Sequence, residues 1–189
     1  MHEQSPRGAE TDRFLERVRS GRAREGVERL ARAFGPDVFR YVASLTRDEH
    51  AAEDITQEAF LAASRGAERF EGASRLKTWL FGIARHVALN WLERERPRTA
   101  AGSGIEPADE RRDPAPSPDE GAQSRDLASR AWSLIAGLPP VERDILTLFY
   151  QQHLSSDEIA RVTGKSRGAI RVAHHRALSR LRELLPPSE

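Results

Sequence analysis

A stretch that cannot fold on its own divides this chain and limits the size of every hydrophobic core. Residues 99–124 contain four prolines, six acidic residues and two basic ones, and Ile105 is their only large apolar residue. Such a segment buries too little apolar surface to compensate for the entropy lost on ordering it. We therefore predict a flexible acidic linker over residues 99–125, between two small units that each have room for three or four helices.

The units on either side of this linker are both predicted to be helical. Apolar residues recur in them at helical spacing, and no segment shows the alternation typical of a strand. Pro36 is expected to start a new helix or to kink one. The predicted organisation is an N-terminal extension over residues 1–24, a helical domain over 25–98, the linker, and a second helical domain over 126–189. The fold class is therefore all-α, with two small helical domains.

Composition excludes several classes of protein. The chain of 189 residues has no cysteine, which removes disulfide frameworks, cysteine-based zinc sites and thiol nucleophiles. It has no run of eighteen apolar residues and no apolar signal-peptide core, so we expect a cytoplasmic protein without membrane insertion. The net charge is only +1 and gives no indication of nucleic acid by itself. Because only Lys77 and Lys165 are lysines, the basic chemistry of the chain is that of arginine.

The C-terminal unit carries the pattern of a helix-turn-helix. Ser155 and Glu158 form an S-x-x-E capping box, which predicts the start of a short helix. Gly164 supplies the left-handed turn that ends this helix, and Ser166 can cap the next one. Ile170 then begins the apolar stripe of a longer helix. A short capped helix, a glycine turn and a longer basic helix are typical of this DNA-binding motif.

The charge of this segment supports DNA binding over the alternative of a solvated cationic helix. Between residues 160 and 182 there are seven basic residues and no acidic one. In such a motif the N-terminal side chains of the second helix reach base edges in the major groove. We place Arg167 and Arg171 on bases or nearby phosphates, and Lys165 and Arg176 on the DNA backbone.

Two other motifs in this segment are misleading. Gly164-Lys165-Ser166 resembles the end of a phosphate-binding loop, but Ile159 stands where that loop needs a glycine. His174 and His175 are adjacent, so they face different directions on a helix, and no nearby residue completes a metal site. We expect no metal, no cofactor and no catalytic residue.

The N-terminal unit combines an acidic helix with a basic one. Asp54, Gln57, Glu58 and Leu61 share one helix face, which is either solvated or a docking surface for a basic protein partner. The loop over residues 69–74 precedes a basic helix and has the composition to hold unstacked bases. The alternative for Phe70, Trp79 and Trp91 is a place in the core, and for the two tryptophans we favour the core.

Segments of both predicted domains resemble a known family. Four segments are similar to the extracytoplasmic-function (ECF) sigma factors of bacteria. They are AAEDITQEAFLAA, RFEGASRLKTWLFGIARHVALNWL, LPPVERDILTLFY and LSSDEIARVTGKSRGAIRVAHHRALSRLREL. The resemblance covers residues 25–96 and 127–185 in the right order. It implies an RNA polymerase subunit without enzymatic activity or a small-molecule substrate. The implied partners are the β′ and β subunits of the polymerase core, promoter DNA, and an anti-sigma factor.

The resemblance also implies roles for particular residues. The first domain would bind a coiled coil of β′ through Asp54, Gln57, Glu58 and Leu61. The minus-ten promoter element would be melted and read by Phe70, Ser74, Arg75, Lys77, Arg85 and His86. The second domain would dock on the β flap and read the minus-thirty-five element with Lys165, Ser166, Arg167, Arg171, His174, His175 and Arg176. One departure is Val172-Ala173, where many members have Ser-Arg, so one DNA-contacting arginine of the family is absent.

Two alternatives to this interpretation remain. A conventional helix-turn-helix regulator with an N-terminal sensor or dimerisation domain would bind palindromic sites without polymerase. The acidic face and the lack of a dimerisation seam argue against it. An enzyme using His50, Glu53 and Asp54 would place those groups on a surface-like helix face with no second cluster of ligands, which argues against catalysis.

Overall fold

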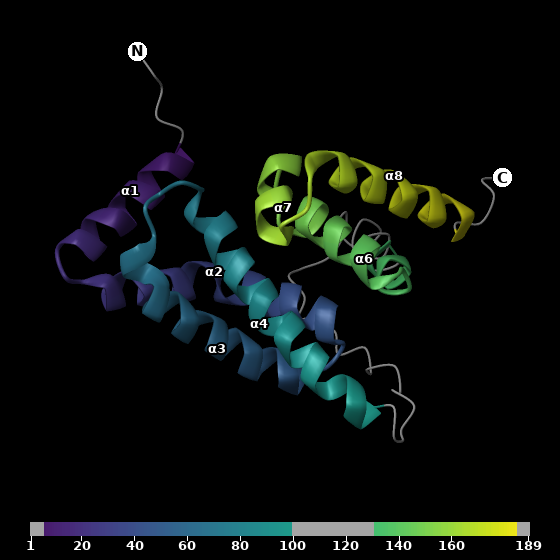
Figure 1. Cartoon of the computed structure of the whole chain (residues 1–189), viewed down its shortest axis with the longest axis horizontal. Coiled ribbons are helices and arrows are strands. Elements are labelled where there is room, and N and C mark those ends of the chain that lie inside the picture. Colours follow the sequence, from purple (N-terminus) through teal and green to yellow (C-terminus); the bar gives the residue numbers. More distant parts are fainter. Residues whose placement is uncertain (1–5, 100–130, 185–189) are drawn as a thin grey trace, which may run out of the picture.

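Every regular element in the computed structural model is a helix within the described residues, 6–99 and 131–184 (Figure 1). The all-α prediction is therefore confirmed for this part of the chain, and most of the predicted linker lies outside it. The N-terminal unit (residues 6–99) and the C-terminal unit (residues 131–184) are named by these ranges. The first contains α1 (Pro6–Arg19), α2 (Ala23–Thr46), α3 (Glu49–Gly66), the 3-10 turn η1 (Ala67–Arg69) and α4 (Leu76–Thr99). The second contains helical residues 131–136, α6 (Pro140–Leu146), the π-turn η2 (Thr147–Gln151), α7 (Ser156–Thr163) and α8 (Arg167–Leu184).

The N-terminal unit is a bundle in which α2, α3 and α4 bury their apolar stripes against one another. Tyr41, Leu80 and Phe81 are fully buried in its centre. α3 begins at its residue because the Asp48 carboxylate accepts a hydrogen bond from the Ala51 backbone N–H at 3.0 Å. The residues predicted to be an extension include α1, which packs against this bundle through the buried Phe14.

The prediction that Pro36 starts a new helix was wrong, because α2 continues through it from Ala23 to Thr46, whereas a kink at Pro36 stays a prediction. A proline has no N–H to offer the carbonyl four residues earlier, here that of Arg32. Both Pro36 and Arg32 are exposed. Water can therefore hydrate the carbonyl that the helix leaves unbonded, and the buried residues on the opposite side of α2 keep the helix continuous.

The C-terminal unit contains the predicted helix-turn-helix. The Ser155 hydroxyl accepts from the Glu158 backbone N–H, and the Glu158 carboxylate accepts from the Ser155 backbone N–H at 2.9 Å. This reciprocal capping box starts α7. Gly164 ends α7 with φ of +69°. Ser166 then caps α8, since its hydroxyl accepts from the Ala169 backbone N–H at 3.2 Å.

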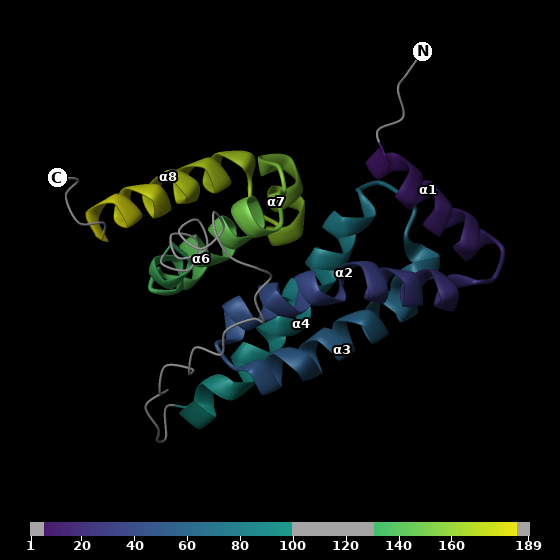
Figure 2. The same cartoon turned by 180° about the vertical axis from the view of Figure 1, so that it is seen from behind.

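The two units pack directly on each other. Figures 1 and 2 show the C-terminal helices along one side of the N-terminal bundle, with α7 beside α4. Ile145, Leu148 and Ile159 of the C-terminal unit are fully buried in the same apolar cluster as the core of the N-terminal bundle. A smaller cluster within the C-terminal unit joins Ile135 to Leu146 and Ala177. The helix-turn-helix is therefore held against the bundle in this arrangement.

Replacing the turn glycine tests how α7 ends. In Gly164→Ala the new Cβ meets no atom within 4 Å, so any loss of stability comes from the left-handed backbone alone. We expect the free energy of unfolding to fall by about 1–2 kcal/mol, measured by urea unfolding followed by circular dichroism. Gly168→Ala is the matched control. Gly168 lies within α8 and its added Cβ makes only ordinary contact, at 3.9 Å, so this variant should be neutral or more stable. Equal destabilisation of both variants would contradict the assigned role of Gly164.

Candidate nucleic-acid interface

The N-terminal end of α8 is the most open basic surface of the helix-turn-helix. Lys165, Ser166, Arg167 and Arg171 are all exposed, while Ile170 on the opposite face of the helix is fully buried and anchors it. Arg167 forms a bidentate pair with Asp157 of α7, with one N–H donating at 2.6 Å. This pair orients the Arg167 guanidinium beside the turn. The predicted minus-thirty-five residues at this end therefore lie together on one accessible surface.

The two adjacent histidines of α8 lie in different surroundings. His174 packs on Phe149, with ring centroids 4.6 Å apart, and its Nε2 lies 3.2 Å from the Tyr150 hydroxyl. Burial lowers the pKa of His174 below its ordinary value, and the neighbouring His175 lowers it further. His175 and Arg176 are exposed. Sequence reasoning treated both histidines alike, but the structure places His174 in an aromatic contact and leaves His175 on the surface.

The predicted minus-ten residues lie at the contact between the two units. Arg75 pairs with Glu158 of α7, with Nη1 and Oε1 3.2 Å apart. Lys77 donates from Nζ to the backbone carbonyl of Gln152 at 2.9 Å. Arg85 donates from Nε to Asp144 of α6 at 2.9 Å. Arg75, Lys77 and Arg85 therefore each bond to an oxygen atom of the C-terminal unit.

The other predicted minus-ten residues are placed differently. Ser74 is half-buried, and His86 is exposed with its ring nitrogen 3.1 Å from the Asn90 amide. Phe70 is only 7% exposed and packs on Trp79, with ring centroids 4.8 Å apart. The sequence left open whether this ring meets DNA or lies in the core, and here it lies in the core. In this arrangement the Phe70 ring is too buried to contact a base directly.

Asp144 is the central acid of the contact between the units. Its two oxygens accept from the Tyr41 hydroxyl at 2.7 Å and from Arg85 at 2.9 Å. The side chains of Asp144 and Arg85 are only 7% and 16% exposed. Burial raises the pKa of Tyr41 well above its ordinary value, and the Asp144 charge adds to the rise, while Arg85 opposes it. Tyr41 therefore stays a neutral donor to a buried carboxylate.

Glu158 joins the same contact while it caps α7. Burial acts to raise its pKa, but hydrogen bonds from the Ser155 backbone and hydroxyl, and the charge of Arg75, outweigh burial and leave the pKa lowered. The Thr78 hydroxyl of α4 also lies 3.3 Å from its carboxylate. One carboxylate thus serves both as the partner of the capping box and as an acceptor for α4.

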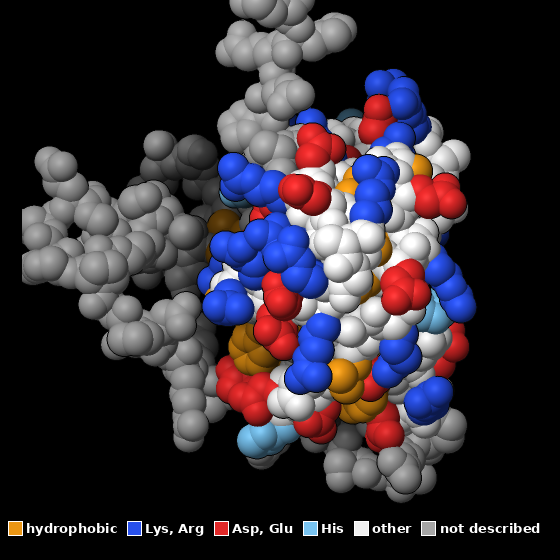
Figure 3. All heavy atoms as spheres, turned by 90° about the vertical axis from the view of Figure 1, so that its left-hand side faces the viewer, with side chains coloured by type: hydrophobic (Ala, Val, Ile, Leu, Met, Phe, Trp, Pro, Cys, Tyr) orange, Lys and Arg blue, Asp and Glu red, His pale blue; other side chains and the backbone are white. Residues whose placement is uncertain are grey.

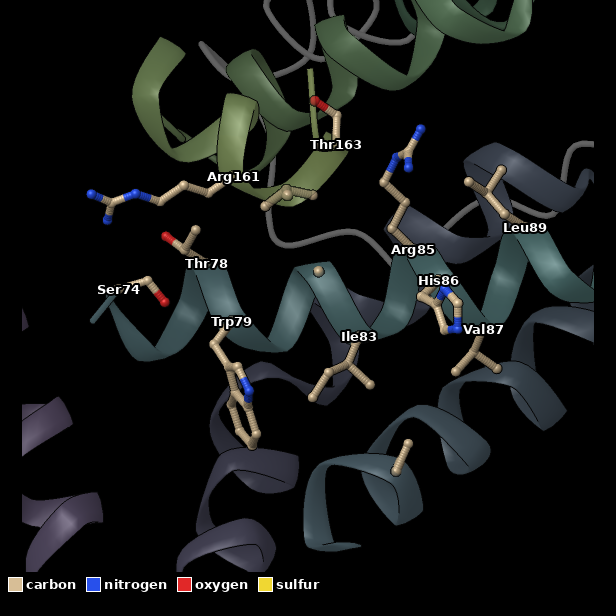
Figure 4. A pocket seen from close by; sticks show the side chains of 14 residues that line it. Ser74, Thr78, Trp79, Ile83, Arg85, His86, Val87, Leu89, Arg161 and Thr163 are labelled. Atoms are coloured by element: carbon tan, nitrogen blue, oxygen red, sulfur yellow. The ribbon is translucent and has the colours of Figure 1, made fainter. Parts of the chain in front are cut away.

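A groove of about 670 Å³ runs between α4 and the turn of the helix-turn-helix. Figure 4 shows Thr78 and Arg85 on the side of α4 that faces α7, and Trp79 and Ile83 on the other side. Arg161 of α7 also donates to the backbone carbonyl of Ala73, in the loop before α4, at 3.3 Å. The groove follows the helix that carries the predicted minus-ten residues.

The acidic face of α3 points away from the core. Asp54, Gln57, Glu58 and Leu61 are all exposed, and Leu61 is 55% exposed, which is unusual for a large apolar side chain. Ile55 on the other side of the helix is buried. Glu58 pairs with Arg65 at 2.5 Å within the same helix. The four predicted polymerase-binding residues therefore form one accessible surface of mixed acidic and apolar character.

No group of three or more His, Cys, Asp or Glu side chains in residues 6–99 and 131–184 is placed to hold a metal ion. None of the helices in these ranges is long and apolar enough to cross a membrane.

Comparison with known proteins assigns both units to one family. Sigma-70 region 2 matches residues 30–98, and Sigma-70, region 4 matches residues 129–181. The chain is 37% identical over 139 residues to the ECF RNA polymerase sigma factor ShbA of Streptomyces griseus, covering 71% of this chain and 72% of that protein. It is 33% identical over 158 residues to the probable RNA polymerase sigma factor RfaY of Xanthomonas campestris, covering 83% of this chain but only 40% of that protein. The chain is an ECF sigma factor.

A solved structure agrees with this assignment. The sigma factor RpoE of Bartonella quintana, in complex with the anti-sigma factor NepR, matches with a TM-score of 0.66 and 26% sequence identity. The match covers 86% of this chain and 98% of that one. The resemblance seen in the sequence is thus confirmed, and the protein is a non-enzymatic factor that directs transcription initiation by RNA polymerase.

Sequence reasoning missed the residues of this sigma factor that join its two units. Nothing in the sequence indicates that Tyr41 and Asp144 meet, and Glu158 is recognised only as the partner of the capping box, not as an acceptor for Arg75 and Thr78. Asp144 stands directly before the apolar pair Ile145 and Leu146, and this is the one signal of burial that the sequence offers. The acceptor for Arg85 lies 59 residues away along the chain, so no local pattern connects the two.

Removing the Asp144 carboxylate should open the contact between the units. Asp144→Ala leaves Arg85 and the Tyr41 hydroxyl without their buried acceptor, and breaking a buried pair costs about 3–5 kcal/mol while the groups stay buried. Separation of the units returns both groups to water, so we expect opening rather than global unfolding. Small-angle X-ray scattering should show a larger radius of gyration, and hydrogen exchange should become faster on the facing sides of α4 and α6.

The matched control for this variant is Asp157→Ala. It removes a carboxylate of the same unit, but one whose partner Arg167 is exposed and lies within the helix-turn-helix. The control should keep the radius of gyration of the wild type. An unchanged radius and unchanged exchange in Asp144→Ala would show that the other contacts between the units keep them together without this carboxylate.

Proposed function

We propose that this sigma factor binds the polymerase core through α3 and reads its promoter with α4 and α8. The observation that carries the proposal is the division of its surfaces by charge. The basic residues of the helix-turn-helix gather at the start of α8, while Asp54, Glu58 and Leu61 lie on an acidic and apolar face of α3. DNA is repelled by the second surface and attracted by the first. We assign α3 to the β′ subunit, the C-terminal unit to β, and the protein to the cytoplasm.

Promoter reading, in this proposal, requires the two units to separate. Arg75, Lys77 and Arg85 bond to the C-terminal unit, and DNA phosphates cannot take those positions while the bonds remain. The start of α8 stays exposed in the same arrangement. The minus-ten surface is therefore covered and the minus-thirty-five surface is open. After separation, Ser74, Arg75, Lys77, Arg85 and His86 would contact the melted strand.

We also propose an anti-sigma factor as a partner. The support is the likeness to RpoE of Bartonella quintana, which was solved in complex with the anti-sigma factor NepR. The groove of about 670 Å³ between α4 and the helix-turn-helix is the candidate contact surface on this chain. A protein held there would keep the minus-ten residues inaccessible.

Run-off transcription with purified bacterial core polymerase tests the proposal. The template is the DNA upstream of the operon that encodes this protein. A specific transcript that requires the added protein supports promoter recognition. Tight binding to this DNA without core polymerase, and no transcript with it, would favour the conventional regulator instead.

A charge reversal on α3 should weaken binding to core polymerase. Asp54→Arg places a cation on the proposed docking face, and juxtaposed like charges across an interface cost several kcal/mol. We expect at least tenfold weaker affinity for core in fluorescence anisotropy and a matching loss of run-off transcript. Circular dichroism should stay unchanged because Asp54 is exposed. Glu16→Arg makes the same charge change at an exposed position of α1, outside the surfaces assigned to core, and should bind core normally. Normal core affinity of Asp54→Arg would remove the docking assignment of this face.

Truncation of one arginine on α8 should weaken use of the minus-thirty-five element. Arg171→Ala removes an exposed guanidinium, and a good contact to a base edge is worth about 1–3 kcal/mol. We expect holoenzyme affinity for promoter DNA to fall about five- to a hundredfold, with core affinity unchanged. Arg182→Ala, an exposed arginine near the far end of the same helix, is the control and should keep wild-type affinity. Equal promoter affinity in both variants would show that Arg171 does not contact DNA.

A further inference from the structure

The loop between η1 and α4 lies against α1, a helix outside the Sigma-70 region 2 match, which begins at residue 30. In Figures 1 and 2, α1 lies beside the chain that leads into α4. The loop covers residues 70–75 and carries Ser74 and Arg75 of the proposed minus-ten surface. α1 contacts it at its beginning, its middle and its end, and each contact has a different physical origin.

The contact at the end of the loop is a hydrogen bond that caps α4. The Thr11 hydroxyl of α1 accepts from the Leu76 backbone N–H at 3.3 Å. Arg75 precedes this helix, and its carbonyl accepts from the Trp79 backbone N–H at 3.1 Å. A guanidinium cannot accept hydrogen bonds, so Arg75 cannot cap the helix that it starts. α4 takes its acceptor from α1 instead, across 65 residues of sequence.

The contact at the beginning of the loop is aromatic. Phe14 of α1 is 3% exposed and meets the edge of Phe70 at 5.8 Å and Trp79 at 5.9 Å between ring centroids. Phe70 starts the loop and Trp79 lies in the first turn of α4. One α1 side chain therefore fixes both ends of the loop relative to each other. This explains why Phe70 is buried although its neighbours along the loop are more exposed.

The contact in the middle of the loop is a close approach of Gly72 to Leu15 of α1. Gly72 has φ of +79°, and a Cβ added there would lie 2.9 Å from Cδ1 of Leu15 in α1. The backbone conformation favours glycine, and the end of the Leu15 side chain would have to move to admit a Cβ. The loop therefore approaches α1 most closely at Gly72, beside Leu15.

We propose that α1 holds the minus-ten loop in one conformation and that Thr11 and Phe14 are positioning residues for promoter reading. Thr11 and Phe14 are 9% and 3% exposed, so neither presents a surface to DNA. Their effect passes through Leu76 and Phe70, which set where Ser74, Arg75 and Lys77 lie. The outer surface at the α1 end is covered by interspersed basic and acidic side chains, which agrees with a helix whose specific contacts face inward (Figure 3). The proposal rests on the proposed minus-ten function of this loop.

A loop held in one conformation before binding loses less entropy when it captures unstacked bases. Without the Thr11 acceptor, the first turn of α4 frays and the loop samples several conformations. The consequence is confined to the melted strand. Binding to core polymerase through α3 and to minus-thirty-five duplex through α8 does not use the loop, and both should be unaffected.

The test is a pair of Thr11 variants in the reconstituted holoenzyme. Thr11→Val keeps the shape of the side chain without an acceptor, and Thr11→Ser keeps the hydroxyl. The probe is a forked oligonucleotide with the single-stranded minus-ten region of the promoter found by run-off transcription, together with its single-base variants. We expect Thr11→Val to bind the matched strand about three- to tenfold more weakly, the range for one hydrogen bond, and to discriminate less between bases. Thr11→Ser should behave as the wild type.

Hydrogen exchange of the free protein gives a direct readout of the loop. Peptides over residues 70–80 should exchange faster in Thr11→Val and at the wild-type rate in Thr11→Ser. Wild-type binding and exchange in Thr11→Val would overturn the proposal. So would an equal loss in Thr11→Ser, or an equal loss of core and minus-thirty-five binding, because those results indicate packing or global stability rather than positioning.

A parallel variant separates failure of this proposal from failure of the minus-ten assignment. Lys77→Ala removes a proposed phosphate contact on α4. If Lys77→Ala weakens binding to the forked oligonucleotide and Thr11→Val does not, only the positioning role is wrong. If neither variant has an effect, the loop and α4 do not read the minus-ten strand, and the function proposed for them is wrong as well.

Discussion

The buried carboxylate of Asp144 is the interaction on which the arrangement of the two units depends. It lies where α6 of the C-terminal unit meets α2 and α4, and it accepts from both Tyr41 and Arg85. A buried charge is tolerated only with such partners, so the acid stays buried only while the units stay together. The Arg75–Glu158 pair is weaker support, because Arg75 is half exposed and water screens the attraction. Apolar packing of Ile145 and Ile159 stabilises the contact between the units, but it is non-directional and does not fix how the units are aligned.

The elements that sequence reasoning predicted correctly are those with a local cause. The capping box of Ser155 and Glu158 and the glycine turn at Gly164 each act within a few residues, so their pattern is visible in the chain and the helix-turn-helix followed from it. The face of Asp54, Gln57, Glu58 and Leu61 follows from helical spacing alone, and the structure exposes all four residues. Family membership followed from two such units in the right order.

The features that sequence reasoning missed depend on contacts between distant segments. The sequence predicts that Pro36 starts or kinks a helix, but α2 continues through it. Pro36 and Arg32 both lie on the exposed side of α2, where water can hydrate the unpaired Arg32 carbonyl. The sequence offers no sign that Thr11 caps α4, because the donor and acceptor lie 65 residues apart. The sequence left open whether Phe70 meets DNA or lies in the core, because its partner Phe14 lies before residue 25, where the resemblance to the family begins. The N-terminal helix is therefore the part of the fold where sequence pattern was least informative and tertiary contact most important.

The closed arrangement also limits the order in which the proposed partners can bind. The α3 face and the start of α8 are exposed in it, whereas Lys77 and Arg85 of α4 bond to a carbonyl and a carboxylate oxygen of the C-terminal unit. In the proposed function, core polymerase can therefore bind α3 before the units separate, whereas DNA phosphates can reach Arg75, Lys77 and Arg85 only after they have separated. Carboxylates and phosphates offer similar oxygen acceptors to arginine, so exchanging one for the other changes little in the bonds themselves. The free energy for opening must come from contacts that only the open form makes, and a polymerase that engages the two units at fixed separate positions supplies such contacts.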